Sequence, residues 1–171
     1  MKIIDIFPKN KERFTRLIAF LTDILDVCED INIHPILNGS LAVFLYTNNQ
    51  DLVINDIDLP HAEKDFPKIE SALIKSGFNV QIRPWHVLQV RKDDLKVEFV
   101  DTDFWYPGVV IEHQDFLEIG KHKLRVLKLD SLTSFYEIGS KNLFLDKEMQ
   151  QKYLEVKAKH ELLKSIRNQN S

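Results

Sequence analysis

Apolar and polar residues alternate along the chain with two periods, one helical and one strand-like. Near the start, apolar residues recur at steps of three and four, which is the spacing of one buried helix face. These residues are Phe14, Leu17, Ile18, Leu21, Leu25 and Cys28. The spacing predicts an amphipathic helix over residues 11–29, with Asn10 as its N-cap.

A strand, a glycine turn and a helix are predicted next. Residues 33–38 are short and mostly apolar, Gly39-Ser40 follows them, and residues 41–46 are apolar. The helix that begins there is expected to end at the polar run 48–50.

The middle of the chain predicts strands and one further helix. Residues 53–60 predict a strand that ends at Pro60, and residues 64–76 predict a helix that stops at Gly77. The inward residues of this helix are Phe66, Ile69 and Leu73. Further strands are predicted at 79–83, 86–92 and 95–100, and a hairpin around Gly120.

Two helices are predicted to close the chain. Asp130 is a suitable N-cap for a helix over residues 131–141. The final helix has an apolar stripe formed by Met149, Tyr153, Val156, His160, Leu163 and Ile166. Its polar tail, residues 167–171, is expected to fray. Because no linker interrupts the pattern, residues 1–171 are predicted to form one α+β domain.

Composition narrows the class of protein. With 44% hydrophobic and 29% charged residues, the chain fits one folded domain, and 171 residues leave little room for a separate substrate domain. A net charge of −3 argues against nucleic-acid binding by bulk electrostatics. A single cysteine, Cys28, and the lack of any apolar run of membrane-spanning length predict a cytoplasmic protein that does not enter a membrane.

Asp56 and Asp58 are the first candidates for chemistry. Two residues apart in a strand, their carboxylates project from one face, which suits a hard divalent cation. Spacing alone is weak, because 26 acidic residues give about four such pairs by chance and the sequence has four. Only this pair lies within an apolar strand.

Glu98 is the candidate third carboxylate. It is the lone acid in the apolar segment 95–100, and burying an unpaired carboxylate costs free energy unless a cation compensates. Strand alternation places Asp101 on the opposite face, where we expect a solvated loop residue. The alternative is that Glu98 is a surface residue facing Lys96.

Phosphate-binding groups are predicted at two places. Gly39 lets the backbone approach a ligand, and Ser40 begins a helix whose free amides favour anions. An ordinary turn explains the same pair without any function. Lys121, Lys123 and Arg125 share one face of the predicted hairpin, which either binds phosphates or is merely its solvated side.

The spacing of the histidines and the presence of only one cysteine argue against a zinc site. No two histidines have the spacing of metal ligands within a helix or turn, so no local zinc cluster is predicted.

Trp105-Tyr106 either stacks on a base or covers the edge of the core.

Three motifs in order resemble the DNA polymerase β-like nucleotidyltransferase superfamily. They are Leu37-Asn38-Gly39-Ser40, Asp56-Ile57-Asp58-Leu59 and Val97-Glu98-Phe99. The closing helices are similar to those of its small bacterial members, which include antibiotic adenylyltransferases and toxin-antitoxin nucleotidyltransferases. The resemblance implies a mixed β-sheet flanked by helices, with C-terminal helices.

The resemblance also implies a function. Asp56 and Asp58 would hold Mg²⁺ or Mn²⁺, Ser40 would contact the outgoing phosphates, and Glu98 would bind a second metal or deprotonate the acceptor. The expected reaction is metal-dependent transfer of a nucleoside monophosphate from a nucleoside triphosphate, ATP in the first instance, with release of pyrophosphate. The acceptor is unidentified: a small molecule, a protein or a tRNA.

Two departures from the family pattern leave alternatives open. The interval between Ser40 and Asp56 is longer than usual, and Glu98 stands where many members have aspartate. The chain could therefore be a catalytically degenerate member that binds nucleotide or acts as a toxin-antitoxin partner, as a homodimer or with another protein. A metal-dependent phosphohydrolase using the same acids is less favoured, because His61 is the only histidine close to them in sequence.

Overall fold

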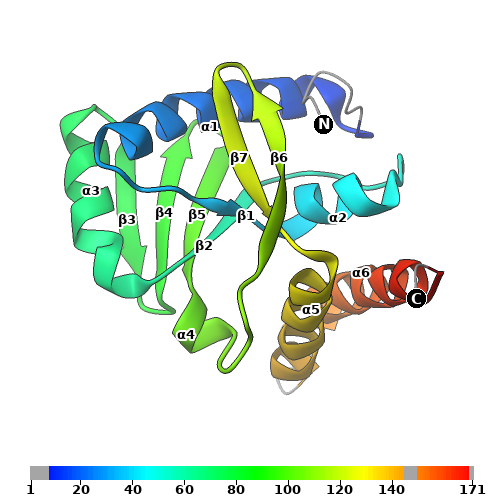
Figure 1. Ribbon diagram of the computed structural model, residues 1–171. Coiled ribbons are helices and arrows are strands. Elements are labelled where there is room, and N and C mark those ends of the chain that lie inside the picture. Colours follow the sequence, from blue (N-terminus) through cyan, green and yellow to red (C-terminus); the bar gives the residue numbers. More distant parts are fainter. Residues whose placement is uncertain (1–7, 145–149, 170–171) are drawn as a thin grey trace.

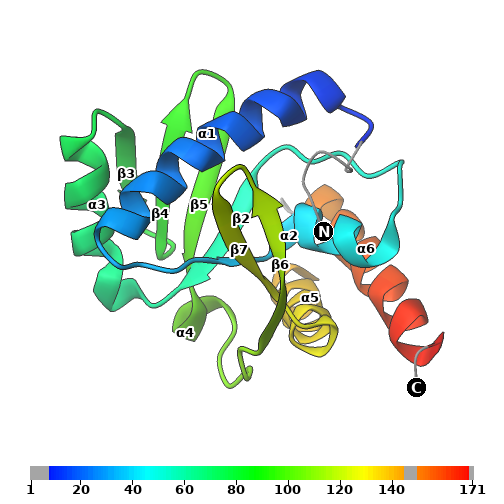
Figure 2. The ribbon, with the colours of Figure 1, turned by 45° about the horizontal axis from the view of Figure 1, so that its top comes forward.

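The computed structural model describes residues 8–144 and 150–169. Its helices are α1 (Lys11–Asp30), α2 (Gly39–Thr47), the 3-10 helix η2 (Glu63–Asp65), α3 (Phe66–Lys75), α4 (Thr102–Trp105), α5 (Leu129–Phe144) and α6 (Gln150–Gln169). Its strands are β1 (Ile36–Leu37), β2 (Ile57–His61), β3 (Asn79–Arg83), β4 (Val87–Lys92), β5 (Leu95–Asp101), β6 (His113–Ile119) and β7 (His122–Leu127). Figures 1 and 2 show this arrangement from two directions.

The strands form two small mixed sheets that meet at one point. One sheet has the order β2-β5-β4-β3, with β2 parallel to β5 and the other pairs antiparallel. The other has the order β1-β7-β6, with β1 parallel to β7. An isolated bridge between Asn38 and Asp58 joins them, through a hydrogen bond of 2.9 Å from the Asn38 amide to the Asp58 carbonyl. The predicted mixed α+β fold is therefore confirmed.

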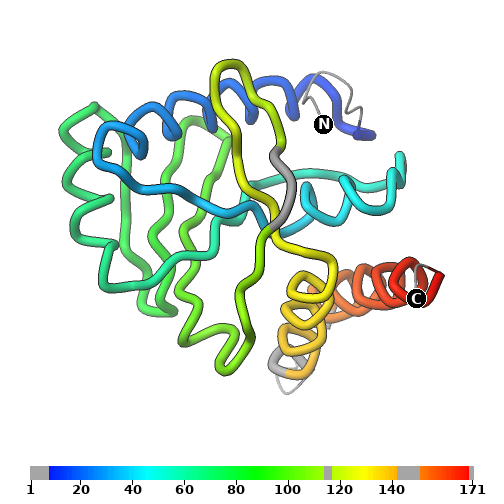
Figure 3. The backbone as a smooth tube through the Cα atoms, in the orientation of Figure 1, coloured from blue at the N-terminus to red at the C-terminus, as the bar shows by residue number. Residues whose placement is uncertain are grey.

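Helices cover these sheets and extend to one side. Helix α1 packs against β5 and α3, whereas α5 and α6 pack on each other and on α2. In Figure 3 the strands β1, β2 and β7 lie close together in the middle of the molecule, and the chain enters α5 after β7. The C-terminal helices thus approach the point at which the two sheets meet.

The apolar periodicity predicted most elements with their correct faces. In α3 the residues Phe66, Ile69 and Leu73 are buried, as expected from their spacing. The meander and the Gly120 hairpin also lie where they were predicted. In α6, His160 and Leu163 are buried, whereas Met149 lies outside the described residues.

Three predicted helix features are different in the structure. Asn10 precedes α1, but its side chain makes no cap; instead it binds both backbone groups of Ile54, at 2.8 and 3.1 Å. Helix α5 begins at Leu129, so Asp130 lies in its first turn and is not its N-cap. Helix α6 continues to Gln169, so residues 167–169 of the expected frayed tail are helical.

The second predicted strand is shorter and shifted. Strand β2 spans only Ile57–His61, so Asp56 lies just before it and Pro60 lies within it. Proline lacks an amide hydrogen and is tolerated in β2 because this strand is at the edge of its sheet. The first predicted strand is likewise reduced, to Ile36–Leu37. Among the described residues, no helix combines the length and the apolar character needed to span a membrane.

Candidate metal and phosphate site

Three carboxylates come together where the two sheets meet. Strands β2 and β5 are parallel neighbours whose register places Asp58 beside Glu98, and Asp56 enters β2 from the preceding loop. Each of the three offers an oxygen, and these oxygens lie within 4.8 Å of one another. Residues that are 40 positions apart in sequence are thus brought into one site.

Lys96 lies between two of these carboxylates. Its Nζ is 2.9 Å from Asp56 Oδ2 and 3.0 Å from Glu98 Oε2. Burial opposes the charge of this ammonium, but Asp56 and Glu98 outweigh burial and raise the Lys96 pKa. The second oxygen of Glu98 accepts a hydrogen bond of 2.6 Å from Gln89 Nε2. Both oxygens of Glu98 therefore have donors.

The carboxylate of Asp58 is the exception. Among the described residues no side chain forms a hydrogen bond or ion pair with it. Burial, and then the negative charges of Asp56 and Glu98, raise its pKa to about 7, against the opposing effects of Lys96 and Lys152. A divalent cation with a preference for oxygen ligands would relieve this repulsion, so the donor set fits Mg²⁺ or Mn²⁺.

Gly39 gives Asp58 the room it needs. Its φ of +71° is in the left-handed region, which favours glycine. A Cβ atom at this position would also lie 2.1 Å from Asp58 Oδ2, well inside any permitted contact. Glycine is required twice here, once for the turn into α2 and once for the carboxylate packed against it.

Ser40 connects the glycine turn to the C-terminal helices. Its side chain is largely buried, and its Oγ accepts a hydrogen bond of 2.7 Å from Lys159 Nζ of α6. Burial lowers the pKa of Lys159, while Asp58 and Asp56 act in the opposite direction. A cation from the last helix therefore lies next to the predicted phosphate turn.

Sequence reasoning did not find Lys159, although a signal existed. Lys159 is three residues after Val156 and four before Leu163, so it lies on the predicted inward stripe. A lysine on the buried face of a helix needs an anionic or hydrogen-bonding partner. The identity of that partner depends on the packing of α6 against α2, which periodicity does not give.

The basic hairpin residues have other contacts. Lys121 forms an ion pair of 2.7 Å with Asp26 on α1, and Arg125 lies 3.5 Å from a ring nitrogen of His113. Among the described contacts, none joins Lys121, Lys123 or Arg125 to the three carboxylates or to Ser40. In Figure 1 the tip of this hairpin lies beside α1.

Asp101 is buried, so the expectation of a solvated loop residue was wrong. It is 5% exposed. Its Oδ1 accepts a hydrogen bond from the Glu63 amide and its Oδ2 one from the Phe104 amide, each at 3.1 Å. Asp101 thereby caps α4 and stays out of the site, as strand alternation predicted. His61 pairs with Asp65 at 3.0 Å. No described ion pair joins His61 to Asp56, Asp58 or Glu98.

The two aromatic residues after β5 have different surroundings. Trp105 donates a hydrogen bond of 2.8 Å from its indole nitrogen to the Trp85 carbonyl. Tyr106 stacks on Phe135 of α5, with ring centroids 3.8 Å apart. Tyr106 therefore covers the edge of the core beside the site.

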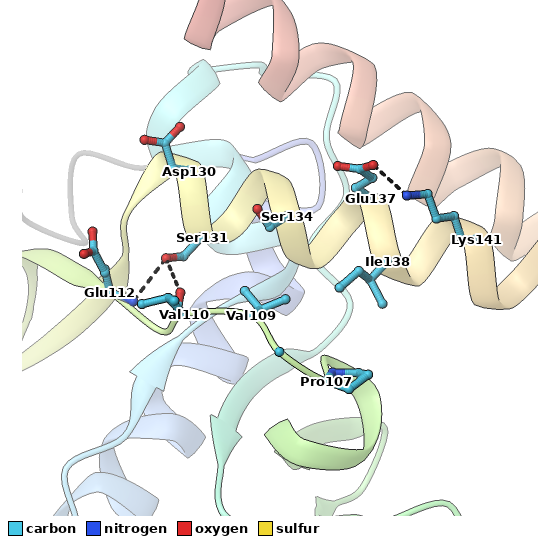
Figure 4. A pocket seen from close by; sticks show the side chains of 11 residues that line it. Pro107, Val109, Val110, Glu112, Asp130, Ser131, Ser134, Glu137, Ile138 and Lys141 are labelled. Atoms are coloured by element: carbon cyan, nitrogen blue, oxygen red, sulfur yellow. Dashed lines mark hydrogen bonds and ion pairs between the residues drawn. The ribbon is translucent and has the colours of Figure 1, made fainter.

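A pocket of about 560 Å³ opens between residues 107–110 and α5 (Figure 4). Three carboxylates line it, and each has a cation within 4 Å: Glu112 with Lys128, Asp130 with Arg167, and Glu137 with Lys141. Its lining includes neither the grouped acids nor the glycine turn. The candidate site is therefore separate from this pocket.

The fold, with its grouped carboxylates beside a Gly-Ser turn, is that of a nucleotidyltransferase. A family model described as aminoglycoside-2''-adenylyltransferase matches residues 20–151, a span that contains all three acids. The chain belongs to this family. A comparison with curated proteins found no match.

Solved structures agree with this fold. The antibiotic-resistance factor ANT(2'')-Ia in solution is similar with a TM-score of 0.62 at 13% identity, covering 90% of each chain. Its crystal structure with adenylyl-2''-tobramycin gives a TM-score of 0.53 at 12% identity, covering 90% of this chain and 98% of that one. A candidate nucleotidyltransferase from Thermotoga maritima gives 0.57 at 21% identity, covering 82% and 94%.

Proposed function

We propose that this protein is a magnesium-dependent adenylyltransferase that transfers AMP from ATP to a hydroxyl group of a small-molecule acceptor and releases pyrophosphate. One observation carries the proposal. Three carboxylates offer oxygens within 4.8 Å of one another, and the middle one, Asp58, packs directly on Gly39 of the glycine turn. Metal ligands and a phosphate-binding turn are thus in contact.

Asp56 and Asp58 are the residues that would hold the metal. Asp58 has no described partner among the side chains, and its carboxylate is crowded by two others. When bound, Mg²⁺ neutralises phosphate charge and orients the triphosphate for in-line attack. Glu98 completes the carboxylate set on the neighbouring strand, where it would bind a second cation or accept the proton of the acceptor hydroxyl.

Ser40 and Lys159 are proposed to bind the outgoing phosphates. The Ser40 oxygen already accepts a hydrogen bond from Lys159, so its own hydrogen can be donated to a phosphate oxygen. The amides at the start of α2 favour an anion, and the Lys159 ammonium adds a positive charge at the same place. For Lys121, Lys123 and Arg125, nucleotide binding stays a prediction.

The acceptor is proposed from the family. Its name describes adenylyl transfer to the 2''-hydroxyl of aminoglycosides, and the ANT(2'')-Ia crystal structure contains adenylyl-2''-tobramycin. The alternative of a degenerate member is not favoured, because all three acids are present and grouped. The buried Cys28 thiol fits the reducing cytoplasm, where we place the protein.

A direct assay tests this proposal. The full chain is incubated with Mg²⁺, tobramycin and each of the four nucleoside triphosphates in turn, and pyrophosphate and the modified acceptor are measured. We expect both products with ATP and neither with Asp56→Asn. Pyrophosphate without a modified tobramycin would leave the transfer chemistry in place and redirect the search to another acceptor. Neither product under any condition would contradict the proposal.

A further inference from the structure

We infer that Lys96 supplies the second cation of this site, so that the protein binds one divalent metal ion, at Asp56 and Asp58, instead of two. This inference rests on the proposed function, because it concerns how the same carboxylates are neutralised. Lys96 joins Asp56 to Glu98 with contacts of 2.9 and 3.0 Å. An ammonium thus lies where a second ion would bridge the two strands.

Strand geometry fixes Lys96 in this position. Lys96 and Glu98 are two residues apart on β5, so their side chains project from the same face. The register pairs Ile57 with Val97, which brings the loop residue Asp56 level with Lys96 on the neighbouring strand. The Lys96 side chain is only 26% exposed, whereas most lysine side chains lie in solvent. The two contacts are therefore a consequence of the fold.

Glu98 is already engaged on its other side. Its Oε1 accepts a hydrogen bond of 2.6 Å from Gln89, which is itself 4% exposed. The side-chain oxygen of Gln89 accepts hydrogen bonds from Arg83, at 2.9 Å, and from Arg91. Because this network orients the Gln89 amide toward Glu98, each Glu98 oxygen already has one donor, which leaves Glu98 with less lone-pair capacity for a metal ion.

Without nucleotide, the three carboxylates are neutralised by Lys96 and a single metal ion. When ionised, Asp56, Asp58 and Glu98 carry three negative charges. The Lys96 ammonium and one divalent cation together carry three positive charges. A second divalent ion placed between Asp56 and Glu98 would repel the Lys96 ammonium that already contacts both.

Lys96 acts as a positioning residue in this scheme. It holds the carboxylate of Glu98 toward Asp56, beside the place that an acceptor hydroxyl must approach. A carboxylate oriented in this way accepts the proton of the hydroxyl as the oxygen attacks phosphorus.

Counting bound Mn²⁺ tests the inference. The full chain is saturated with Mn²⁺ and α,β-methylene-ATP, separated from free ions, and the manganese per chain is measured by elemental analysis and electron paramagnetic resonance. We expect one Mn²⁺ per wild-type chain, one for Lys96→Arg, and two for Lys96→Ala. The matched control is Lys92→Ala, because Lys92 is exposed on the adjacent strand and pairs with Asp23 at 3.8 Å. That control should bind one.

The outcomes separate this inference from the proposed function. Two Mn²⁺ ions per wild-type chain, with normal adenylyl transfer, would overturn the inference and leave the function in place. One ion in both the wild type and Lys96→Ala would also overturn it, since Lys96 would then not occupy a cation position. Failure of the wild type to bind any Mn²⁺ would contradict the proposed function itself. Circular dichroism of each variant checks that the fold is retained.

Discussion

Two clusters of metal-ligand residues lie along the paired strands β2 and β5, and they differ in whether their carboxylates have hydrogen-bond donors. Asp56, Asp58 and Glu98 form the first; Glu63, His86 and Asp101 form the second, and each offers ligand atoms within 4.8 Å of one another. The register pairs Asp58 with Glu98 and, farther along, His61 with Asp101. The distances between ligand atoms therefore do not distinguish the two clusters.

Hydrogen bonding distinguishes them. In the second cluster Asp101 accepts two backbone amides, and Glu63 pairs with His86 at 2.9 Å. In the first, Asp58 has no described side-chain partner, and its pKa is raised to about 7 by desolvation and by the two neighbouring acids. Both clusters bring ligand atoms together, but only the first contains a carboxylate, that of Asp58, without a described hydrogen-bond donor. This shortage of donors is what favours the first cluster as the metal site.

The largest difference is expected between two variants, each with one acid of one cluster substituted. Asp58→Asn should reduce adenylyl transfer by about a thousandfold or more, because it removes a proposed metal ligand. Asp101→Ala should leave the rate constant nearly unchanged but destabilise the fold by about 1–3 kcal/mol, because two backbone amides lose their acceptor. Transfer assays and denaturant unfolding measure the two effects. Equal loss of transfer in both variants would remove the distinction.

Gly39→Ala is expected to have the next largest effect. The added methyl group would lie 2.1 Å from Asp58 Oδ2, so the carboxylate must move and transfer should fall by about a hundredfold. Gly77→Ala is the matched control, since Gly77 also has a positive φ, of +86°, but nothing lies within 4 Å of its Cβ position. If both variants lose transfer equally, backbone strain and not the Asp58 contact explains the result.

Lys159→Gln tests the phosphate side of the site. Loss of the ammonium that contacts Ser40 should raise the KM for ATP about tenfold, which corresponds to about 1.4 kcal/mol. Lys157→Gln is the control, because Lys157 is exposed on the same helix and lies over the Tyr153 ring. Steady-state kinetics with ATP as the varied substrate measure the change. An unchanged KM in Lys159→Gln would remove Lys159 from the phosphate-binding groups.

The last expected effect is on stability instead of transfer, and it depends on pH. The folded pKa of Asp58 is raised from 3.8 to about 7, so the protonated form stabilises the fold at low pH and this contribution is lost as pH rises through 7. Asp58→Asn, which cannot ionise, should therefore be more stable than the wild type at pH 8 without metal, by roughly 1–4 kcal/mol. Near pH 4 the two should be alike. Thermal unfolding in a chelator at both values tests the sign.

Much of the fold could be predicted from local pattern. The helix α3, the meander and the Gly120 hairpin follow from apolar spacing and turn residues, which depend on near neighbours in sequence. The Asp56–Asp58 pair and Glu98 could be selected as candidate metal ligands for the same reason, because an acid within an apolar segment stands out from its neighbours in sequence.

Features that depend on distant partners could not be predicted. Asp101 is buried because the Glu63 amide, 38 residues away, reaches it. Asn10 binds Ile54 instead of capping its own helix, and Lys159 contacts Ser40 across 119 positions. In each case a polar side chain had several possible partners, and only the packing of the elements selected one.

The most direct test of the metal site is calorimetry of ATP binding with and without Mg²⁺. We predict a binding heat that requires Mg²⁺ in the wild type and is lost in Asp56→Asn, because we propose that Asp56 and Asp58 hold the ion that the triphosphate needs. Equal binding by the wild type and Asp56→Asn, or binding of ATP that is independent of Mg²⁺, would contradict the account.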